Sequence, residues 1–285
     1  ITNRESAYPN RINIPIADED ANVTFYTISR EDKSDKIGSI RIFQYKLFTR
    51  KLCLHSVRKY RFKAPEGLQA TERQEVKDER NDQKRNEQLA KTVIKGLQSR
   101  NMSGYYAEDK EAALKQALEL IPEGSTIAMG GCMSAGEIGL ISALEAGNYH
   151  YIDRSKMDAR AGLMAAYDAD IFLSSANAIT SDGVMVNIDG NSNRVSCIAQ
   201  GPRKVIFIVG INKVCADLDS AMKRARNVAA PINAQRFDIK TPCKETGKCF
   251  DCKSPDTICC QFLITRYSRH TDRIHVILVN DTIGY

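Results

Sequence analysis

Apolar runs of strand length alternate with helical patterns along the chain beyond residue 77, and this order restricts the folds open to it. The strand-like runs lie at residues 125–129, 149–152, 170–174, 183–188, 204–209 and 273–279. Helical patterns separate several of them, at residues 134–145, 159–167 and 217–228. A helix that follows a strand returns the chain to the same edge of a sheet, so the next strand runs parallel to the first. The sequence therefore predicts an α/β domain over residues 77–285, with a mostly parallel sheet flanked by helices.

Two further helices are predicted ahead of the first of these strands. Over residues 77–99, Leu89, Val93 and Leu97 share one face, while Lys and Glu cover the other. A second helical pattern covers residues 108–120. Both are typical of helices that pack one side against a core.

Residues 1–75 have a different character. They combine short β-prone runs at Val23–Ser29 and residues 40–43 with charge clusters, and they show no sustained periodicity. Pro65 and Gly67 mark a break after them. The sequence leaves three interpretations of this N-terminal appendage open: a small β unit, a disordered tail, or sequence that is not native to the domain.

Charge and composition exclude some partners. The net charge of the 285 residues is +6, most of the basic excess lies in the first 75 residues, and the remainder is nearly balanced. Such a domain does not indicate a nucleic-acid partner. No apolar run is long enough to span a membrane, and no signal-peptide pattern is present. We therefore expect a cytoplasmic protein, and the sequence leaves open whether it forms a homo-oligomer.

A glycine turn carries the clearest sign of a binding site. Gly130 and Gly131 follow the strand at residues 125–129, and a helix is predicted to begin near Ser134. Glycines let the backbone approach a ligand closely, and the free N–H groups of a helix N-terminus favour an anion. The pattern predicts ligand binding at Gly130, Gly131 and Ser134. The alternative is a tight turn in which Ser134 and Glu137 form a capping box.

Small polar side chains crowd the segment after the predicted strand at residues 170–174. Ligands bind at the carboxyl ends of strands in open α/β sheets. The ligand-binding residues expected in this segment are Asn177, Thr180, Asp182, Asn187 and Asn191. Ordinary turn chemistry explains the same composition equally well.

A hairpin is predicted within this region. Asp189, Gly190 and Asn191 form a turn signal between β-prone runs at residues 183–188 and 194–199. We therefore expect these two runs to pair as antiparallel strands.

Five of the nine cysteines fall within 18 residues, in the loop-like pattern C-x5-C-x2-C-x6-C-C. A C-x2-C pair lets two thiolates reach one ion from a single turn, and nearby thiolates complete the set. The candidate metal ligands are Cys243, Cys249, Cys252, Cys259 and Cys260. Zinc or an iron–sulfur cluster suits four thiolates, and free thiols are the alternative. Cys132, in the glycine turn, is expected to be a packed residue or a thiol of lowered pKa.

Four segments occur in an order that resembles the LUD (lactate utilisation) family. They are the glycine turn with Glu137-Ile138-Gly139, the run from Ala169-Asp170 to Asp182-Gly183, residues 204–214, and residues 274–285. The resemblance implies a fold related to ribose-phosphate isomerase, glucosamine-phosphate deaminase and CoA transferases. It also implies a link to iron–sulfur complexes that oxidise lactate. It supplies no catalytic residue, and Glu137 is expected to be a helix cap rather than a CoA-transferase nucleophile.

These observations lead to three functional hypotheses, and they leave open whether the protein is an enzyme. The first is a redox accessory or enzyme subunit in lactate or organic-acid oxidation. Its partners are a small anionic metabolite and iron–sulfur redox subunits, and it carries the Cys-ligated metal. The second is a metabolite-binding enzyme related to sugar-phosphate isomerases, with a structural zinc. The third is a non-catalytic scaffold for iron–sulfur partner proteins.

Overall fold

The computed structural model describes residues 11–17, 23–29 and 70–285, with side chains from Arg80 onward. The chain divides into two compact units, Ile1–Gln74 and Glu75–Tyr285. In the first unit, β1 (Arg11–Ala17) pairs antiparallel with β2 (Val23–Ser29). Strand β2 coincides with the β-prone run expected at Val23–Ser29. The β-prone run at residues 40–43 lies outside the described residues, as does most of the predicted N-terminal appendage.

A six-stranded sheet forms the centre of the second unit, and every neighbouring pair in it is parallel. In spatial order its strands are β3 (Ser103–Ala107), β12 (Ile274–Val279), β9 (Lys204–Gly210), β6 (Ile171–Ser174), β4 (Thr126–Met129) and β5 (His150–Ile152). The predicted mostly parallel sheet flanked by helices is confirmed. Strand β3 was not predicted, because Ser103 and Gly104 interrupt its apolar pattern.

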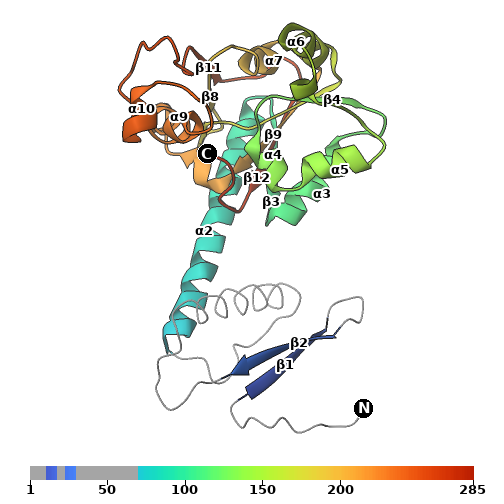
Figure 1. The fold of residues 1–285 in the computed structure, drawn as a ribbon, viewed down its shortest axis with the longest axis vertical. Coiled ribbons are helices and arrows are strands. Elements are labelled where there is room, and N and C mark those ends of the chain that lie inside the picture. Colours follow the sequence, from blue (N-terminus) through green and yellow to red (C-terminus); the bar gives the residue numbers. More distant parts are fainter. Residues whose placement is uncertain (1–10, 18–22, 30–69) are drawn as a thin grey trace. The chain divides into compact units, whose positions relative to one another are not determined.

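Helices cover both faces of this sheet (Figure 1). One face packs against α2 (Ala70–Ser99), α6 (Ala159–Asp168) and α7 (Val195–Ala199). The other packs against α3 (Lys110–Leu120), α4 (Met133–Glu137) and α5 (Leu140–Ala146). Neighbouring residues along the central strands alternate between the two cores, as Phe172 and Leu173 do. Apolar residues on both faces explain why these strands are continuous hydrophobic runs.

The helix predicted at residues 134–145 is in fact two helices, α4 and α5. Gly139 separates them in a left-handed conformation, with φ of 78°. This conformation favours glycine and ends a right-handed helix. No helix among the described residues combines the length and hydrophobicity needed to cross a membrane.

The C-terminal half adds several short helices. Where one α-helix was predicted over residues 217–228, α8 (Leu218–Arg224) continues as a π-helical turn (Ala225–Ala229) into α9 (Ala230–Ala234). The remaining helical segments are α10 (Pro242–Thr246) and the 3-10 turns Arg154–Lys156 and Ile211–Lys213.

A second sheet lies beside the carboxyl end of the first. Its order is β10 (Val214–Cys215), β7 (Ala178–Thr180), β8 (Met185–Asp189) and β11 (Gln261–Thr265). Strand β8 is antiparallel to both β7 and β11. The turn from β7 to β8 requires Gly183, which has φ of 87° and lies against α2, where a Cβ would stand 2.6 Å from the Leu97 nitrogen.

The predicted hairpin between residues 183–188 and 194–199 is wrong. The second run forms α7, and β8 pairs with β7 and β11 instead. Asp189 decides this locally, because its carboxylate accepts the backbone N–H groups of Arg194 at 2.8 Å and Val195 at 3.0 Å. A carboxylate on the first N–H groups of a helix stabilises that end, so the chain turns into a helix after β8.

Candidate functional site

The carboxyl ends of four parallel strands meet at one pocket of about 360 Å³. Gly131 follows β4, Ser175 follows β6, Lys213 follows β9 and Gly284 follows β12. The opposite wall comes from the end of β8, from the start of α7 and from the segment after α9. In α/β sheets of this kind ligands bind beyond the carboxyl ends of the strands, so this pocket is the candidate site.

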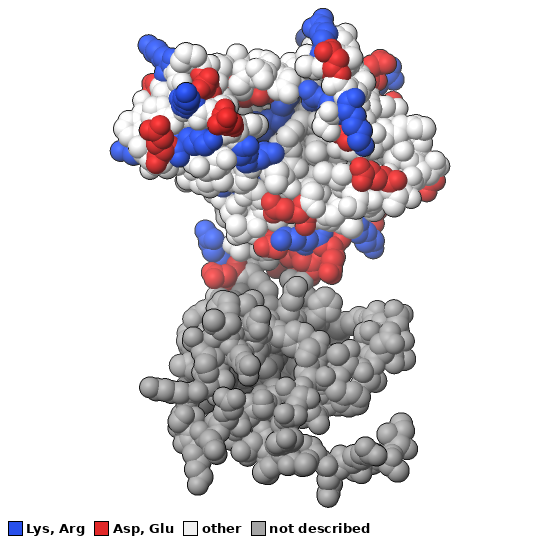
Figure 2. Space-filling model, in the orientation of Figure 1, with Lys and Arg blue, Asp and Glu red and all other residues white. Residues whose placement is uncertain are grey.

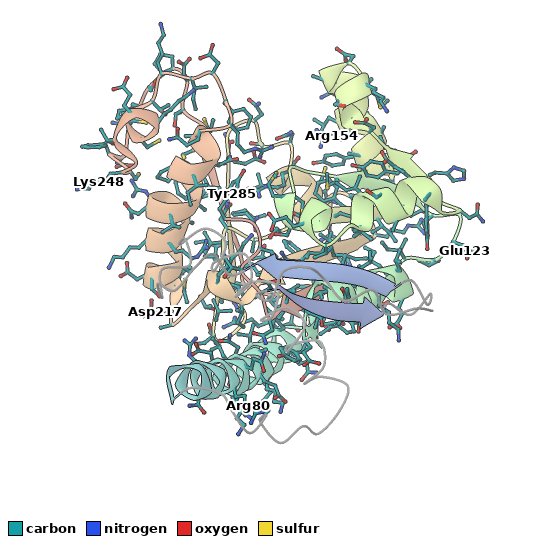
Figure 3. All side chains as sticks on the ribbon, turned by 60° about the horizontal axis from the view of Figure 1, so that its bottom comes forward. Arg80, Glu123, Arg154, Asp217, Lys248 and Tyr285 are labelled. Atoms are coloured by element: carbon teal, nitrogen blue, oxygen red, sulfur yellow. The ribbon has the colours of Figure 1, made fainter. Side chains whose placement is uncertain are left out.

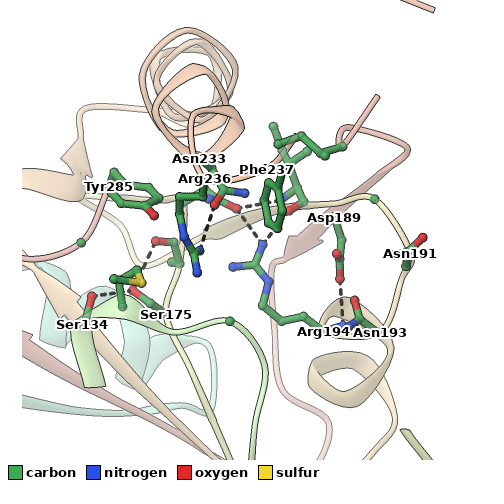
Figure 4. A pocket seen from close by; sticks show the side chains of 18 of the residues that line it. Ser134, Ser175, Asp189, Asn191, Asn193, Arg194, Asn233, Arg236, Phe237 and Tyr285 are labelled. Carbon is green, nitrogen blue, oxygen red and sulfur yellow. Dashed lines mark hydrogen bonds between the residues drawn. The ribbon is translucent and has the colours of Figure 1, made fainter. Parts of the chain in front are cut away.

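Lys213 lies at the base of the pocket with only 1% of its surface exposed. Its Nζ donates to Ser175 Oγ at 3.0 Å and to Ser134 Oγ at 3.4 Å. Both serines are buried, and they face one another in Figure 4 with their hydroxyl oxygens 3.5 Å apart. Burial lowers the pKa of Lys213 to about 8. Within residues 80–285 no carboxylate forms an ion pair with this amine, so its charge is available to a bound anion.

The C-terminal segment covers this cluster. Gly284 lies against it so closely that a Cβ there would stand 2.7 Å from Lys213 Nζ. The Gly284 N–H lies 3.2 Å from each carboxylate oxygen of Glu137 and donates to them. The alternative interpretation of the glycine turn, a capping box formed by Ser134 and Glu137, is therefore wrong. Helix α4 begins after Cys132, which leaves Ser134 free to face Lys213 and Glu137 free to hold the segment above it.

Two arginines enter the pocket from opposite sides (Figure 4). Arg194 Nη2 donates to Asn177 Oδ1 at 3.0 Å and to the Ile188 carbonyl at 2.5 Å, which fixes its guanidinium. Burial lowers the pKa of Arg194, although it remains a cation. Arg236 is exposed, donates to Asn233 Oδ1 at 3.2 Å and lies over the Phe237 ring. Together with Lys213 they give the pocket an excess of positive charge.

Four of the predicted ligand-binding residues line this pocket: Gly131, Ser134, Asn177 and Asn191. At Gly131 a Cβ would meet open space. Gly130 does not line the pocket, because it packs against Phe172 and Arg194. Asn187 lies buried beneath, where its Nδ2 donates to the Ser175 carbonyl at 2.8 Å and its Oδ1 has no hydrogen-bond partner among residues 80–285.

The structure does not bring Thr180 and Asp182 to the pocket. Thr180 ends β7 and Asp182 lies in the turn that follows, where Thr180 Oγ1 donates to Asp182 Oδ1 at 2.5 Å. Asp182 also forms an ion pair with Arg100, at the end of α2. The hydrogen bond from Thr180, followed by the nearby Arg100, holds the pKa of Asp182 below its usual range. These contacts give the two residues a role in joining α2 to the second sheet.

The sequence did not identify the cationic residues of the pocket. Ser175 and Lys213 follow the strands predicted at residues 170–174 and 204–209, so their position after a buried strand is a usable signal. Arg194 had no such signal, because residues 194–199 were assigned to a strand. Arg236 follows a short helix that was not predicted.

Cys132 is a packed residue, with 4% of its surface exposed. Burial raises the pKa of its thiol, so the alternative of a thiol with lowered pKa is wrong. The reason is that the side chain points into the core beneath α4 rather than into the pocket.

The clustered cysteines lie between α9 and β11, at one edge of the domain, where Figure 3 marks Lys248. A second cavity, of about 40 Å³, is lined by four of them: Cys243, Cys249, Cys252 and Cys259. Burial, and then the other four thiols, raise the pKa of Cys259 to about 11. Cys260 is exposed and does not line the cavity. Within the described residues, no group of three or more His, Cys, Asp or Glu side chains stands in a geometry that could hold an ion.

Charged side chains of both signs are interspersed on the face of the described unit drawn in Figure 2. The positive charge of the pocket is therefore a local feature rather than part of an extended basic surface on that face.

Comparison with known proteins gives one family match. The family model described as LUD domain matches residues 90–279, which include all four strand ends at the pocket and the cysteine segment. No curated protein matches the chain. Among solved structures, a DUF162 family protein from Deinococcus radiodurans is similar, with 12% identity and a TM-score of 0.42, over 68% of this chain and 98% of that one.

Proposed function

Because its residues 90–279 match that model, this chain belongs to the LUD domain family, and we propose that it binds a small organic-acid anion around Lys213. The setting that we propose is the utilisation or oxidation of lactate or a similar acid, with which the family is associated. The observation that carries the proposal is the buried amine of Lys213, which faces the pocket and forms no ion pair with a carboxylate of residues 80–285.

The chemistry of the pocket suits a small hydroxy or oxo acid. A carboxylate placed beside Lys213 would lose its hydrogen bonds to water, and the ammonium group of Lys213 and two serine hydroxyls would replace them as donors. A 2-hydroxyl or 2-oxo group has neutral partners within the same pocket, such as Asn177. The volume of about 360 Å³ lies near the lower end of the range of ligand sites, which favours a small metabolite.

We also propose that the domain of residues 77–285 is related in fold to sugar-phosphate isomerases and CoA transferases, as the family resemblance implies. The parallel sheet and the position of the pocket are compatible with it. A cytoplasmic setting belongs to the same proposal, supported by the unpaired thiols among residues 80–285.

Calorimetric titration of the full chain with lactate, pyruvate and ribose 5-phosphate tests the proposal. We expect the acids to bind, and Lys213→Met to weaken binding by about 10- to 100-fold, as expected for loss of a charge-assisted hydrogen bond. Ser175→Ala retains the amine and should weaken binding by less than tenfold. Lys115→Met is the matched control, because this exposed lysine of α3 lies outside the pocket.

Two results would contradict the proposal. Equal affinity of the parent protein and Lys213→Met, with the variant folded by circular dichroism, would remove Lys213 from the site. Binding of ribose 5-phosphate with no binding of either acid would favour the sugar-phosphate hypothesis instead.

A further inference from the structure

We propose that the four thiols around the second cavity bind one zinc ion: Cys243, Cys249, Cys252 and Cys259. The fifth cysteine of the cluster, Cys260, is not a ligand. This site is separate from the pocket around Lys213, and the inference does not depend on which metabolite that pocket takes.

The first argument is the arrangement of the four side chains around one space. They come from α10 and from the segment between α10 and β11, and all four line the same cavity. The cavity is small, with a volume of about 40 Å³. A single ion suits such a space, whereas an iron–sulfur cluster needs room for several iron and sulfide atoms.

The second argument is the backbone of the C-x2-C turn. Asp251 adopts a left-handed conformation, with φ of 53°, which is uncommon for a residue other than glycine. In this conformation its N–H donates to Cys249 Sγ at 3.5 Å. The turn thus directs a backbone donor at one sulfur and places Cys249 and Cys252 around the same cavity. An N–H group that points at sulfur stabilises the thiolate form, which is the form that binds metal.

The third argument is the charge beside the cavity. Arg226 Nη2 lies 3.7 Å from Cys249 Sγ and 2.6 Å from Asp251 Oδ1, so a cation is held against the turn. Four thiolates and one zinc ion carry a net negative charge, and this guanidinium offsets part of it. Thr241 Oγ1, 3.4 Å from Cys243 Sγ, adds a hydroxyl next to another of the sulfurs.

Zinc binding requires the thiols to move towards one another, because none of the described groups stands in ion-holding geometry. Zinc–sulfur bonds are about 2.3 Å long, and each bound thiol releases a proton to the solvent. The three ligands beyond Cys243 lie in residues 247–260, which contain no helix or strand. The movement of these three ligands therefore breaks no helix or sheet hydrogen bonds within that segment.

Cys260 is excluded as a zinc ligand because its side chain does not face the cavity. Its side chain is exposed and lies 3.6 Å from the Thr257 carbonyl, while its N–H donates to the Asp189 carbonyl at 2.9 Å beside β8. Cys259 lines the cavity and Cys260 does not, so only Cys259 of these two neighbours is placed to become a ligand. Cys260 is consequently a matched control for its neighbour.

One residue links the two cavities. Ile258 lines both the pocket around Lys213 and the cysteine cavity, and its Cα lies 3.2 Å from where a Cβ would stand on Gly190. Zinc held by Cys259 would fix this wall of the ligand pocket. The proposed zinc therefore has a structural role rather than a role in the chemistry of the bound acid.

Metal analysis of the full chain, purified with reductant and without chelator, tests this inference. We expect stoichiometric zinc in the parent protein and in Cys260→Ser, and a loss of zinc in Cys249→Ser and Cys259→Ser. Replacement of zinc by cobalt should give the visible absorption of a tetrahedral thiolate site. Stoichiometric iron and sulfide would overturn the zinc assignment, and so would absence of metal from the parent protein after addition of zinc.

Alkylation of the parent protein keeps the inference testable if the serine variants fail to fold. Peptide mass spectrometry should find Cys260 labelled with and without chelator, and the four proposed ligands labelled only after a chelator is added. Labelling of all five at the same rate in both conditions would overturn the proposal. Acid binding by the pocket is measured separately, so either proposal can fail while the other stands.

Discussion

Raising the pH through the pKa of Lys213 is expected to weaken the binding of an organic-acid anion. Burial lowers this pKa to about 8, so the free protein loses the positive charge well below the pH at which an exposed lysine does. A bound carboxylate favours the charged amine. Binding should therefore take up a proton above pH 8, and affinity should fall as the pH rises.

The size of the effect follows from the fraction of charged amine. At pH 9 about a tenth of the Lys213 side chains carry the proton, so the Kd should rise about tenfold between pH 7 and pH 9. This equals about 1.4 kcal/mol of binding free energy. An amine with the ordinary lysine pKa of about 10.4 would give almost no change over the same range. Lactate is ionised throughout, so the ligand contributes no titration of its own.

Calorimetry measures both parts of this prediction. Titrations at several pH values from 7 to 9.5 give the change in Kd, and buffers with different heats of ionisation give the number of protons taken up. Lys213→Met should bind weakly, with no pH dependence and no proton uptake in this range. A Kd for the parent protein that is constant from pH 7 to pH 9.5, without proton uptake, would refute the assignment of the anion to Lys213.

Three further predictions concern the pocket and the packing of the fold. Gly131→Val should abolish acid binding while the melting temperature stays within a few degrees, because its side chain enters open space in the pocket; unchanged affinity by calorimetry would contradict this. Gly183→Ala should lower the free energy of unfolding by about 2 kcal/mol or more in urea titrations, because φ is 87° and the new Cβ meets α2; an unaffected midpoint would contradict the observed packing. Burial lowers the pKa of His275, so its stabilising contribution is present above pH 6.5 and is lost as the pH falls below that value. Unfolding free energies should therefore fall more steeply from pH 7 to pH 5 in the parent protein than in His275→Phe, and equal slopes would exclude His275 as a cause.

The class of fold could be predicted from the pattern of residues along the chain. Buried parallel strands are apolar on both faces, so they are visible as short continuous runs, as residues 204–209 show. Amphipathic helices reveal the face that they bury, as Val93 and Leu97 do in α2. Both signals arise from neighbours in the chain, which is why they could be read without coordinates.

The glycine turn was also visible in the sequence, and Gly131 and Ser134 do line the pocket. What those residues face was not visible. The alternative to ligand binding was a cap at Ser134, because a serine and a glutamate at this spacing satisfy the first N–H groups of many helices. In the structure the hydroxyl instead accepts from Lys213, which is 79 positions away in the chain.

The chemistry of the site depends on long-range packing that the sequence pattern does not reveal. Ser134, Ser175, Lys213 and Gly284 follow four different strands, and the parallel sheet brings those strand ends to one edge. The lowered pKa of Lys213 comes from burial among residues that are distant in the chain, such as Ser175 and Gly284, and no local pattern encodes this. Likewise, α7 replaced a predicted strand because the Asp189 carboxylate reaches the N–H groups of Arg194 and Val195. Local sequence specifies which segments are strands and helices, whereas the environment of a charged side chain depends on residues that only the folded chain brings together.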